Sequence, residues 1–339
     1  MKKTLITSTA LVLLAGAAAA QVSFSGFGRF GIAYDERQTT TGAGADGILG
    51  TADDTVEDSE VALVSRFRLN IDGMATTDGG VEFSARVRLQ ADEVRADNEQ
   101  GAAGLNGARF SVQYGGFRVD AGNVAGSFDN MPNYYGYEPG LELFTGQYVG
   151  VDYNFLAYTS TGRGANAVYA SYTAGGFFFG ASYDQDIVGL ANGAGVIEGD
   201  RWDIGAAYTF NNFTGALTYG ENDADQSLVV LTLAADFDRF SGTLFVGDED
   251  MNLAAGAPDI DGTVYGLSLS FDVGAATSIL ASYGGGEGDS DTEEYGIGFI
   301  HDLGGGVSLR GGIGYEESGV AGVNRTDGMV GDFGVLFNF

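Results

Sequence analysis

Apolar and polar residues alternate with a period of two along almost the whole chain after residue 20. Clusters of Gly, Asn and Asp bound each alternating segment, and this pattern is typical of β-strands whose two faces meet different surroundings. The segments are residues 22–34, 61–73, 81–91, 107–114, 117–124, 165–173, 177–185, 201–210, 213–220, 227–237, 239–248, 262–273, 276–284, 293–302, 307–315 and 328–339. The sequence therefore predicts an all-β protein of sixteen strands.

The connections between these segments alternate in length. Short turns, such as those at 115–116, 174–176 and 211–212, are followed by long polar segments, such as 35–60, 92–106 and 186–200. An even number of antiparallel strands with short turns at one end and long loops at the other is typical of a bacterial outer-membrane barrel. Residues 151–160 could form a seventeenth strand, but this would move a short turn to the long-loop end. We therefore place them in a folded loop at about 125–164.

Aromatic residues gather at both ends of the predicted strands. Those beside the short turns are Tyr114, Phe117, Tyr172, Phe177, Phe210, Phe213, Phe237 and Phe240, and those at the opposite ends are Tyr34, Tyr183, Trp202, Tyr219, Tyr265, Tyr283, Tyr295 and Tyr315. Two aromatic girdles around an apolar band indicate a membrane barrel, whereas a soluble sandwich buries its aromatics in mid-strand. We predict a 16-stranded antiparallel transmembrane β-barrel, multi-pass, in the outer membrane of a Gram-negative bacterium. It would contact lipid and lipopolysaccharide, with short periplasmic turns and long extracellular loops.

The first twenty residues differ from the rest. Lys2 and Lys3 precede an apolar stretch and a small-residue run that ends at Ala20, which predicts a signal peptide at 1–20 and a single barrel domain at 21–339. Without this segment 14 arginines remain against 46 acidic residues, so the formal net charge is −32. Such a chain does not offer a phosphate-neutralising surface, and we expect no nucleic-acid partner.

Four arginines stand at alternate positions in two consecutive predicted strands. Arg66 and Arg68 lie on the polar face of the first, and Arg86 and Arg88 on the polar face of the second. A register slip of one residue would turn all four toward lipid, at a cost of roughly 2 to 4 kcal/mol each near the bilayer midplane. These arginines must therefore line the lumen, where we expect a functional constriction. The alternative is that they only balance the charges of acidic residues inside a filled lumen.

Two further patterns could indicate chemistry. The stretch "GFGRFG" at 26–31 fits the dinucleotide fingerprint, but it lies inside a strand and not between a strand and a helix. Outward-facing Gly26 and Gly28 suggest instead a close approach by another subunit, or only strand variation. His301, the single histidine, adjoins a short turn, and we assign it a structural role. We expect no enzymatic activity and no cofactor.

An acidic cluster at 44–58 contains Asp46, Asp53 and Asp54 among glycines. Flexible carboxylates suit the oxygen ligands of calcium, although the spacing is not that of an EF-hand. The cluster is either a solvated acidic loop or a Ca²⁺ site, and Asp46, Asp53 and Asp54 are its candidate metal ligands.

The chain resembles the general porins of purple nonsulfur and related alphaproteobacteria. The resemblance rests on "VSFSGFGRFGIAY" at 22, "SRFRLNIDGMATTDGGVEFSARVRL" at 65, "AYTFNNFTGALTYG" at 207, "YGLSLSFDVGAATS" at 265, "YGIGFIHDLGGGVSLRGGIGY" at 295 and the ending "VGDFGVLFNF". It implies a homotrimeric channel whose third long loop, about 125–164 here, folds into the barrel and narrows it.

The resemblance also implies which residues form the constriction. A basic wall would consist of Arg29, Arg66, Arg68, Arg86 and Arg88, with Arg109 and Arg310. Acids on the facing loop would be drawn from Asp129, Glu138, Glu142 and Asp152. The terminal Phe337 and Phe339 resemble the signal that the outer-membrane assembly machinery reads, and they also fit the lipid-facing half of a last strand.

The predicted function is a porin, a water-filled channel for passive diffusion of ions and small hydrophilic solutes. The alternative is a structural or adhesive barrel whose lumen is filled by the 125–164 loop. Sixteen strands favour the open channel, because side chains can plug only much smaller barrels.

Overall fold

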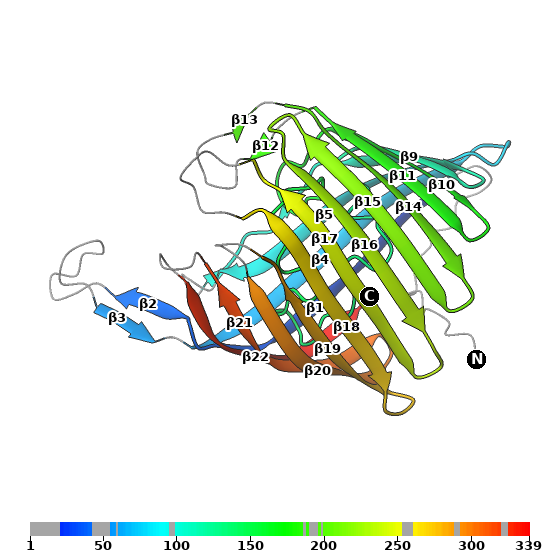
Figure 1. Ribbon diagram of the computed structural model, residues 1–339. Coiled ribbons are helices and arrows are strands. Elements are labelled where there is room, and N and C mark those ends of the chain that lie inside the picture. Colours follow the sequence, from blue (N-terminus) through cyan, green and yellow to red (C-terminus); the bar gives the residue numbers. More distant parts are fainter. Residues whose placement is uncertain are drawn as a thin grey trace.

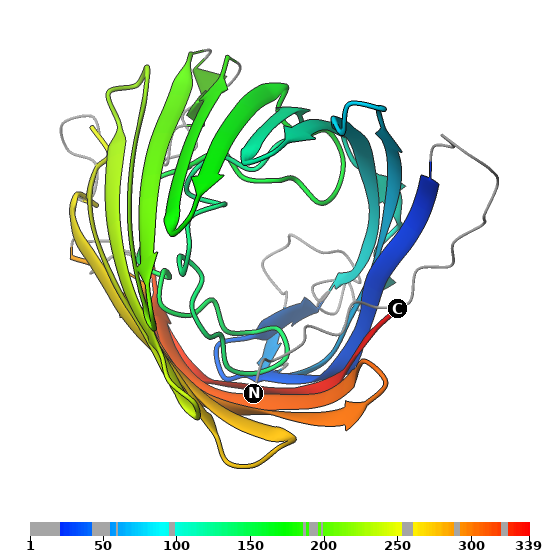
Figure 2. The same cartoon turned by 90° about the vertical axis from the view of Figure 1, so that its right-hand side faces the viewer.

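The chain forms a closed antiparallel β-barrel (Figures 1 and 2). The computed structural model describes residues 21–42, 55–58, 60–94, 99–185, 188–189, 196–197, 199–252, 260–287, 292–319 and 325–339. Sixteen strands make up the wall: β1 (Gln21–Asp35), β4 (Val61–Thr76), β5 (Glu82–Val94), β8 (Arg109–Tyr114), β9 (Phe117–Gly122), β10 (Ala167–Ala174), β11 (Phe177–Asp184), β14 (Arg201–Phe210), β15 (Phe213–Asn222), β16 (Ser227–Asp236), β17 (Phe240–Asp250), β18 (Gly262–Asp272), β19 (Thr277–Gly285), β20 (Glu293–Gly304), β21 (Val307–Ser318) and β22 (Thr326–Asn338). The predicted sixteen-stranded barrel is confirmed.

Pairing of the last strand with the first closes the barrel. β22 runs antiparallel to β1 from the pair Phe27 and Asn338 to the pair Asp35 and Val330. Every wall strand thereby has two neighbours, so no open sheet edge is left within the wall. Each predicted segment matches one wall strand to within a few residues, and residues 151–160 contain no strand, as predicted.

The described residues contain six further short strands that were not predicted. β2 (Thr39–Gly42) and β3 (Thr55–Asp58) form a hairpin in one long connection, and β12 (Val188–Gly189) pairs with β13 (Val196–Ile197) in another. β6 (Glu99–Gln100) and β7 (Gly104–Leu105) pair with the far end of β5. These strands are too short or too polar to produce an apolar alternation, so periodicity could not reveal them.

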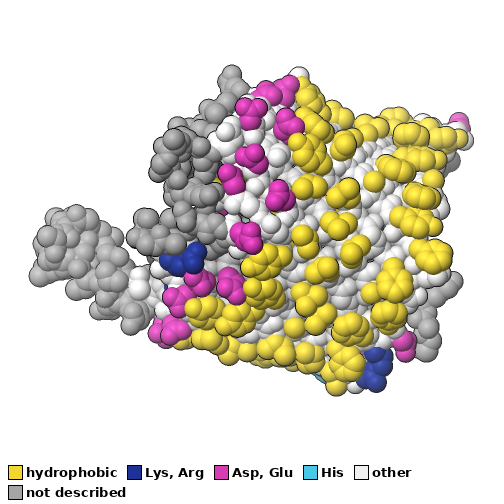
Figure 3. All heavy atoms as spheres, in the orientation of Figure 1, with side chains coloured by type: hydrophobic (Ala, Val, Ile, Leu, Met, Phe, Trp, Pro, Cys, Tyr) yellow, Lys and Arg dark blue, Asp and Glu magenta, His cyan; other side chains and the backbone are white. Residues whose placement is uncertain are grey.

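The outer face of the wall is apolar. Leu63 is 73 % exposed and Phe67 is 44 % exposed, whereas their neighbour Val64 is buried on the other face. Hydrophobic side chains cover the visible wall in a broad band, and acidic side chains gather at the rim beside the long connections (Figure 3). All eight aromatic residues predicted beside the short turns are exposed, as are Tyr34, Tyr183, Trp202 and Tyr295 at the opposite end. No helix in the described part of the chain is long and apolar enough to cross a membrane.

The segment between β9 and β10, residues 123–166, lies inside the barrel (Figure 2). We call it the inner loop. It contributes to the buried core: Phe128, Met131, Tyr134 and Tyr153 pack against wall residues of β14 to β18, among them Phe245. The hydrophobic core of this protein therefore sits between the wall and the loop that the wall encloses.

Glycines of the wall make room for the inner loop. A Cβ atom at Gly296 or Gly314 would lie 2.5 or 2.6 Å from the Phe144 ring. A Cβ atom at Gly334 would lie 2.6 Å from a methyl group of Leu141. Because real Cβ atoms do not approach other atoms so closely, glycine at these lumen positions lets the loop pack directly on the wall backbone.

Gly26 and Gly28 pack against the chain's own C-terminus. A Cβ atom at Gly28 would lie 2.3 Å from the Phe337 ring, and one at Gly26 would lie 3.1 Å from the Phe339 ring. Phe339 exchanges backbone hydrogen bonds with Gly26 and stacks on Phe67, with ring centroids 5.7 Å apart. β22 closes against β1, and this brings the terminal rings over the two glycines. The predicted approach of another subunit at this place stays a prediction.

Removal of Phe339 should reduce the amount of barrel in the outer membrane by more than half while leaving total synthesis almost unchanged. Its backbone and ring hold the closing seam between β22 and β1. Quantitative immunoblots of outer-membrane fractions and whole cells measure both amounts. A Phe339→Tyr variant keeps the ring and serves as control. Unchanged amounts of assembled barrel after the deletion would contradict this prediction.

Candidate functional site

Arginines from neighbouring strands share the lumen face at one side of the barrel. The register places Arg29 of β1 opposite Arg66 of β4, and Arg86 of β5 opposite Arg109 of β8. Arg68 and Arg88 follow two residues further along their strands. Six of the seven arginines predicted for the basic wall therefore lie together on β1, β4, β5 and β8. The seventh, Arg310, lies on β21.

Two of these arginines are neutralised by aspartates of the adjacent strand. Arg66 forms an ion pair with Asp92, which lies opposite it in the ladder. Arg86 binds both carboxylate oxygens of Asp72, at 2.6 and 3.0 Å. Neither aspartate was predicted as a site residue. The sequence nonetheless indicated their side of the wall, because Asp72 and Asp92 stand at the same alternate positions as the arginines and therefore face the lumen.

Three other arginines are held by neutral groups. Arg68 Nε donates to Gln90 Oε1 at 2.6 Å, and Arg88 Nε donates to Asn70 Oδ1 at 2.8 Å. Arg109 stacks on the ring of Tyr158 at 5.4 Å from its centroid, and Arg88 stacks on the same ring at 4.6 Å. Within the described ranges no carboxylate forms an ion pair with Arg68, Arg88 or Arg109.

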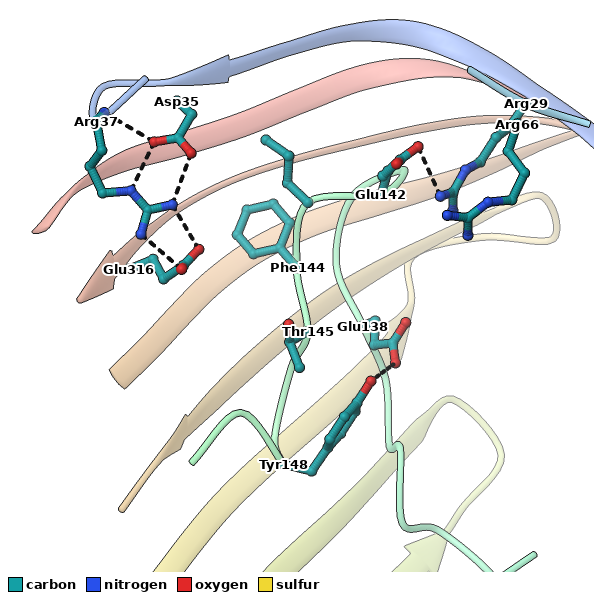
Figure 4. Close-up of a pocket in the computed structure, with 11 residues that line it drawn as sticks. Arg29, Asp35, Arg37, Arg66, Glu138, Glu142, Phe144, Thr145, Tyr148 and Glu316 are labelled. Atoms are coloured by element: carbon teal, nitrogen blue, oxygen red, sulfur yellow. Dashed lines mark hydrogen bonds and ion pairs between the residues drawn. The ribbon is translucent and has the colours of Figure 1, made fainter. Parts of the chain in front are cut away.

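The predicted acids of the inner loop have different surroundings. Glu142 forms an ion pair of 2.8 Å with Arg29, so this loop acid meets the wall arginines directly (Figure 4). Asp129 accepts hydrogen bonds from the Tyr135 hydroxyl and from the Tyr158 backbone N–H. Glu138 accepts a long hydrogen bond of 3.4 Å from the Tyr148 hydroxyl.

The prediction that Asp152 faces the arginines was wrong. Glu249 of β17 accepts hydrogen bonds from the Asp152 and Tyr153 backbone N–H groups. β17 lies across the barrel from β4 and β5 (Figure 2), so this part of the loop is held at the wall opposite the arginines. Asp152 lines neither of the two cavities described next.

Two cavities in the lumen adjoin the inner loop. The first has a volume of about 410 Å³ and is lined by Arg29, Asp35, Arg37, Arg66, Glu138, Glu142, Leu143, Phe144, Thr145, Tyr148 and Glu316. The second has a volume of about 550 Å³ and is lined by Arg68, Arg88, Arg109, Ala125, Asp129, Tyr135, Glu138, Tyr148, Tyr158 and Ser160. Glu138 and Tyr148 border both cavities, so the loop places a carboxylate and a phenol where the two meet.

One ionic cluster in the first cavity was not predicted. Arg37, just beyond the end of β1, binds Asp35 at 2.8 Å and Glu316 of β21 at 2.8 Å (Figure 4). Asp35 and Glu316 lie on strands at either side of β22. The cluster therefore ties the long-loop ends of β1 and β21 together across the closing strand.

Four wall carboxylates hold the inner loop through its backbone. Asp332 of β22 accepts hydrogen bonds from the N–H groups of Leu141, Glu142 and Leu143, at 2.7, 2.6 and 2.9 Å. Glu294 of β20 accepts from Thr145 at 3.1 Å and from Gly146 at 2.7 Å. Asp203 of β14 accepts from Ser127 at 2.7 Å, and Glu249 is the fourth anchor. Hydrogen bonds to charged acceptors are each worth about 1.5 to 3 kcal/mol, so these anchors fix the loop position.

The Glu138 side chain is exposed to both cavities, yet the loop and the wall enclose these cavities inside the barrel. Desolvation by the surrounding protein raises the pKa of Glu138 to about 7, against the opposing effect of Tyr148, Arg29 and Arg310. A carboxyl group with a pKa near neutrality is charged above pH 7 and mostly neutral below it. The charge where the two cavities meet therefore depends on pH.

The pH dependence of ion selectivity should reside largely in Glu138. Between pH 8 and pH 6 the ratio of cation to anion permeability of the wild type should fall, because the protonated carboxyl group no longer attracts cations. A Glu138→Gln variant should show the low-pH selectivity already at pH 8. Reversal potentials in a salt gradient at both pH values measure the effect. Equal pH responses of wild type and variant would contradict this assignment.

Comparison with known proteins places this architecture in one family. The family model for Gram-negative porins matches residues 7–320. The chain belongs to the Gram-negative porin family. It is 29% identical over 297 residues to a porin of Fuscovulum blasticum, a match covering 77% of this chain and 93% of that protein. It is 27% identical over 314 residues to a porin of Rhodobacter capsulatus, with 81% and 93% covered.

A solved structure shows the same fold. The barrel is similar to that of a triple mutant of the Rhodopseudomonas blastica porin, with a TM-score of 0.67 at 24% identity, covering 94% of this chain and all of that chain. The resemblance to alphaproteobacterial porins is confirmed. This porin therefore forms a channel in the outer membrane of a Gram-negative bacterium.

Two further predictions concern His301 and the acidic cluster at 44–58. His301 lies at the short-turn end of β20, where its Nδ1 is 2.8 Å from the Thr277 hydroxyl. Asp46, Asp53 and Asp54 lie outside the described residues, so the calcium site stays a prediction. In the part of the chain that is described, no group of three or more His, Cys, Asp or Glu side chains could hold a metal ion. The family consists of channel proteins and not of enzymes.

Proposed function

We propose that this porin mediates passive diffusion of ions and small hydrophilic solutes through a lumen narrowed by the inner loop. The observation that carries the proposal is the pair of cavities, about 410 and 550 Å³, that adjoin the loop and are lined mainly by charged and hydroxyl-bearing side chains. Surfaces of this kind stay hydrated, and hydrated solutes can pass along them. The loop would then form the constriction and the arginines its basic wall.

The charges at this level are arranged asymmetrically. Arginines of β1, β4, β5 and β8 stand on the wall, and Glu138, Glu142 and Asp129 stand on the loop that faces them. Opposed charges across a narrow pore create a transverse field, which orients dipolar solutes and slows apolar ones that must displace ordered water. This arrangement supports a channel for polar solutes rather than a filled structural barrel.

Single-channel recording in a planar bilayer tests the proposal. Purified porin should insert in discrete conductance steps with an ohmic current–voltage relation at low voltage. In a liposome-swelling assay, small sugars should enter and larger oligosaccharides should not. Absence of conductance from correctly folded barrels would favour the structural or adhesive alternative.

We further propose that three copies assemble in the outer membrane with the help of the assembly machinery, which would read Phe337 and Phe339. Membership of the porin family supports the oligomer, and the exposed terminal rings on the closing seam support the signal. Chemical cross-linking in detergent, followed by electrophoresis with and without heating, measures the number of copies. A cross-linked product no larger than a dimer would contradict the trimer.

A further inference from the structure

We propose that Arg68, Arg88 and Arg109 form a saturable binding site inside the channel for the oxyanion groups, phosphate or carboxylate, of small solutes. The inference rests on the proposed channel function and gives it a preferred class of solute. The three side chains come from three adjacent wall strands, β4, β5 and β8, and all three line the cavity of about 550 Å³. We call this group the arginine triad.

Among the described residues, absence of a carboxylate partner distinguishes the triad from most other lumen arginines, and Arg310, which shares this absence, lies on β21 away from the triad's cavity. Arg29, Arg86, Arg118 and Arg201 each have a carboxylate oxygen within 2.8 Å, and Arg66 is paired with Asp92. Across the described ranges, the triad has no such ion pair. Its cavity also contains Asp129 and Glu138. Three guanidinium groups against two carboxylates leave the cavity with a positive charge even when both acids are ionised.

The two acids of the cavity are engaged elsewhere. Asp129 accepts hydrogen bonds from the Tyr135 hydroxyl and the Tyr158 backbone, and Glu138 accepts from the Tyr148 hydroxyl. These contacts hold the carboxylates on the loop side and not on the triad. An incoming oxyanion would therefore not have to displace an existing ion pair.

Neighbouring side chains fix the orientation of the triad before a solute arrives. Nε of Arg68 is bound by Gln90 and Nε of Arg88 by Asn70, and both guanidinium groups reach the Ser160 hydroxyl, at 3.5 and 2.7 Å. The ring of Tyr158, a residue of the inner loop, packs against the guanidinium groups of Arg88 and Arg109. Such preorganisation reduces the entropy that binding would otherwise cost.

Guanidinium geometry favours oxyanions over chloride. Each guanidinium carries five N–H donors in a planar fork that fits two oxygens of one phosphate or carboxylate group. In the triad only part of these donors is used, and Arg109 makes no hydrogen bond to any residue that the structure describes. A spherical chloride ion cannot use the fork in this way, so an oxyanion should bind more tightly and slow the passage of chloride.

Competition between anions in planar bilayers tests the site. Chloride current through wild-type porin is recorded at constant ionic strength while inorganic phosphate or succinate is added. We expect a saturable decrease in current with half-maximal effect at millimolar concentration. Block by phosphate, by succinate or by both supports the site and identifies the oxyanion, and block by neither overturns it.

Variants separate a specific site from the general field of the pore. Arg88→Gln and Arg109→Gln should each raise the half-blocking concentration at least tenfold, and Arg88→Lys should give an intermediate value because it keeps the charge without the fork. Arg310→Gln is the matched control: Arg310 is a lumen arginine that contacts Ser308 and lines neither cavity. An equal loss of block in Arg310→Gln would overturn the site. Heat-resistant migration on gels verifies that each variant is folded.

The same recordings distinguish failure of the site from failure of the channel function. A folded wild-type barrel that conducts no current in chloride alone would contradict the channel function. A barrel that conducts chloride but is not blocked by either oxyanion would contradict only the site.

Discussion

The Arg68→Ser, Arg88→Ser double variant should be far more cation-selective than wild-type porin. Both side chains face the larger cavity and have no carboxylate partner in the described part of the chain, so their charges act on passing ions without local compensation. Two unit charges about 4 Å apart interact by about 1 kcal/mol in a water-like dielectric. Loss of two such charges should change the ratio of cation to anion permeability by roughly tenfold.

Reversal potentials in a KCl gradient measure this ratio. The shift should shrink in concentrated salt, because the Debye length falls to about 3 Å at 1 M. The matched control removes an ion pair instead of unpaired charges: Arg66→Ser combined with Asp92→Ser leaves the net charge of the lumen unchanged. A control shift as large as that of the test variant would show that selectivity does not depend on the unpaired arginines.

Most of the fold could be predicted from the sequence because a membrane barrel imposes a two-residue period. One face of each strand must be apolar, so the period fixes the strands and the lumen side of Arg66, Arg68, Arg86 and Arg88 together. The lumen position of Asp72 and Asp92 follows from the same two-residue alternation. Their pairing with Arg86 and Arg66 depends on the exact register of β4 and β5, which the alternation alone leaves open.

The inner loop could not be predicted in the same way. Its residues show no period, and the wall determines their conformation through Asp203, Glu249, Glu294 and Asp332. Asp203 and Asp332 stand at lumen positions in otherwise apolar or glycine-rich stretches, and such acids could have indicated anchors. Glu249 and Glu294 stand beside other acids, so their role was not visible in the sequence. The prediction for Asp152 was wrong because Glu249 holds that stretch of the loop away from the arginines. The stacking of Arg88 and Arg109 on Tyr158 likewise depends on contacts that only the folded loop makes.

The other large effect is expected for Asp332→Ala. Three consecutive N–H groups of the inner loop would lose their acceptor, and hydrogen bonds to a charged group are worth about 1.5 to 3 kcal/mol each. The adjoining pair between Arg29 and Glu142 would lose the backbone support that positions it. The barrel should still assemble, since the lost contacts involve the loop and not the strand ladder. Single-channel records should show at least a doubling of open-channel current variance, with transitions between sublevels.

Three variants make this expectation specific to the anchor. Asp332→Asn keeps an acceptor oxygen and should have a smaller effect. Asp302→Ala removes the same charge from a short turn, where Asp302 accepts a hydrogen bond from Gly304, and should leave the noise unchanged. Gly140→Ala keeps the carboxylate but disturbs the contact, because Gly140 has a φ of 84° and its Cβ atom would lie 2.5 Å from Asp332 Oδ1. If Asp332→Ala channels are as quiet as the wild type, the loop is held in place by its apolar packing on the wall, through Phe144 and Leu141, and not by the carboxylate.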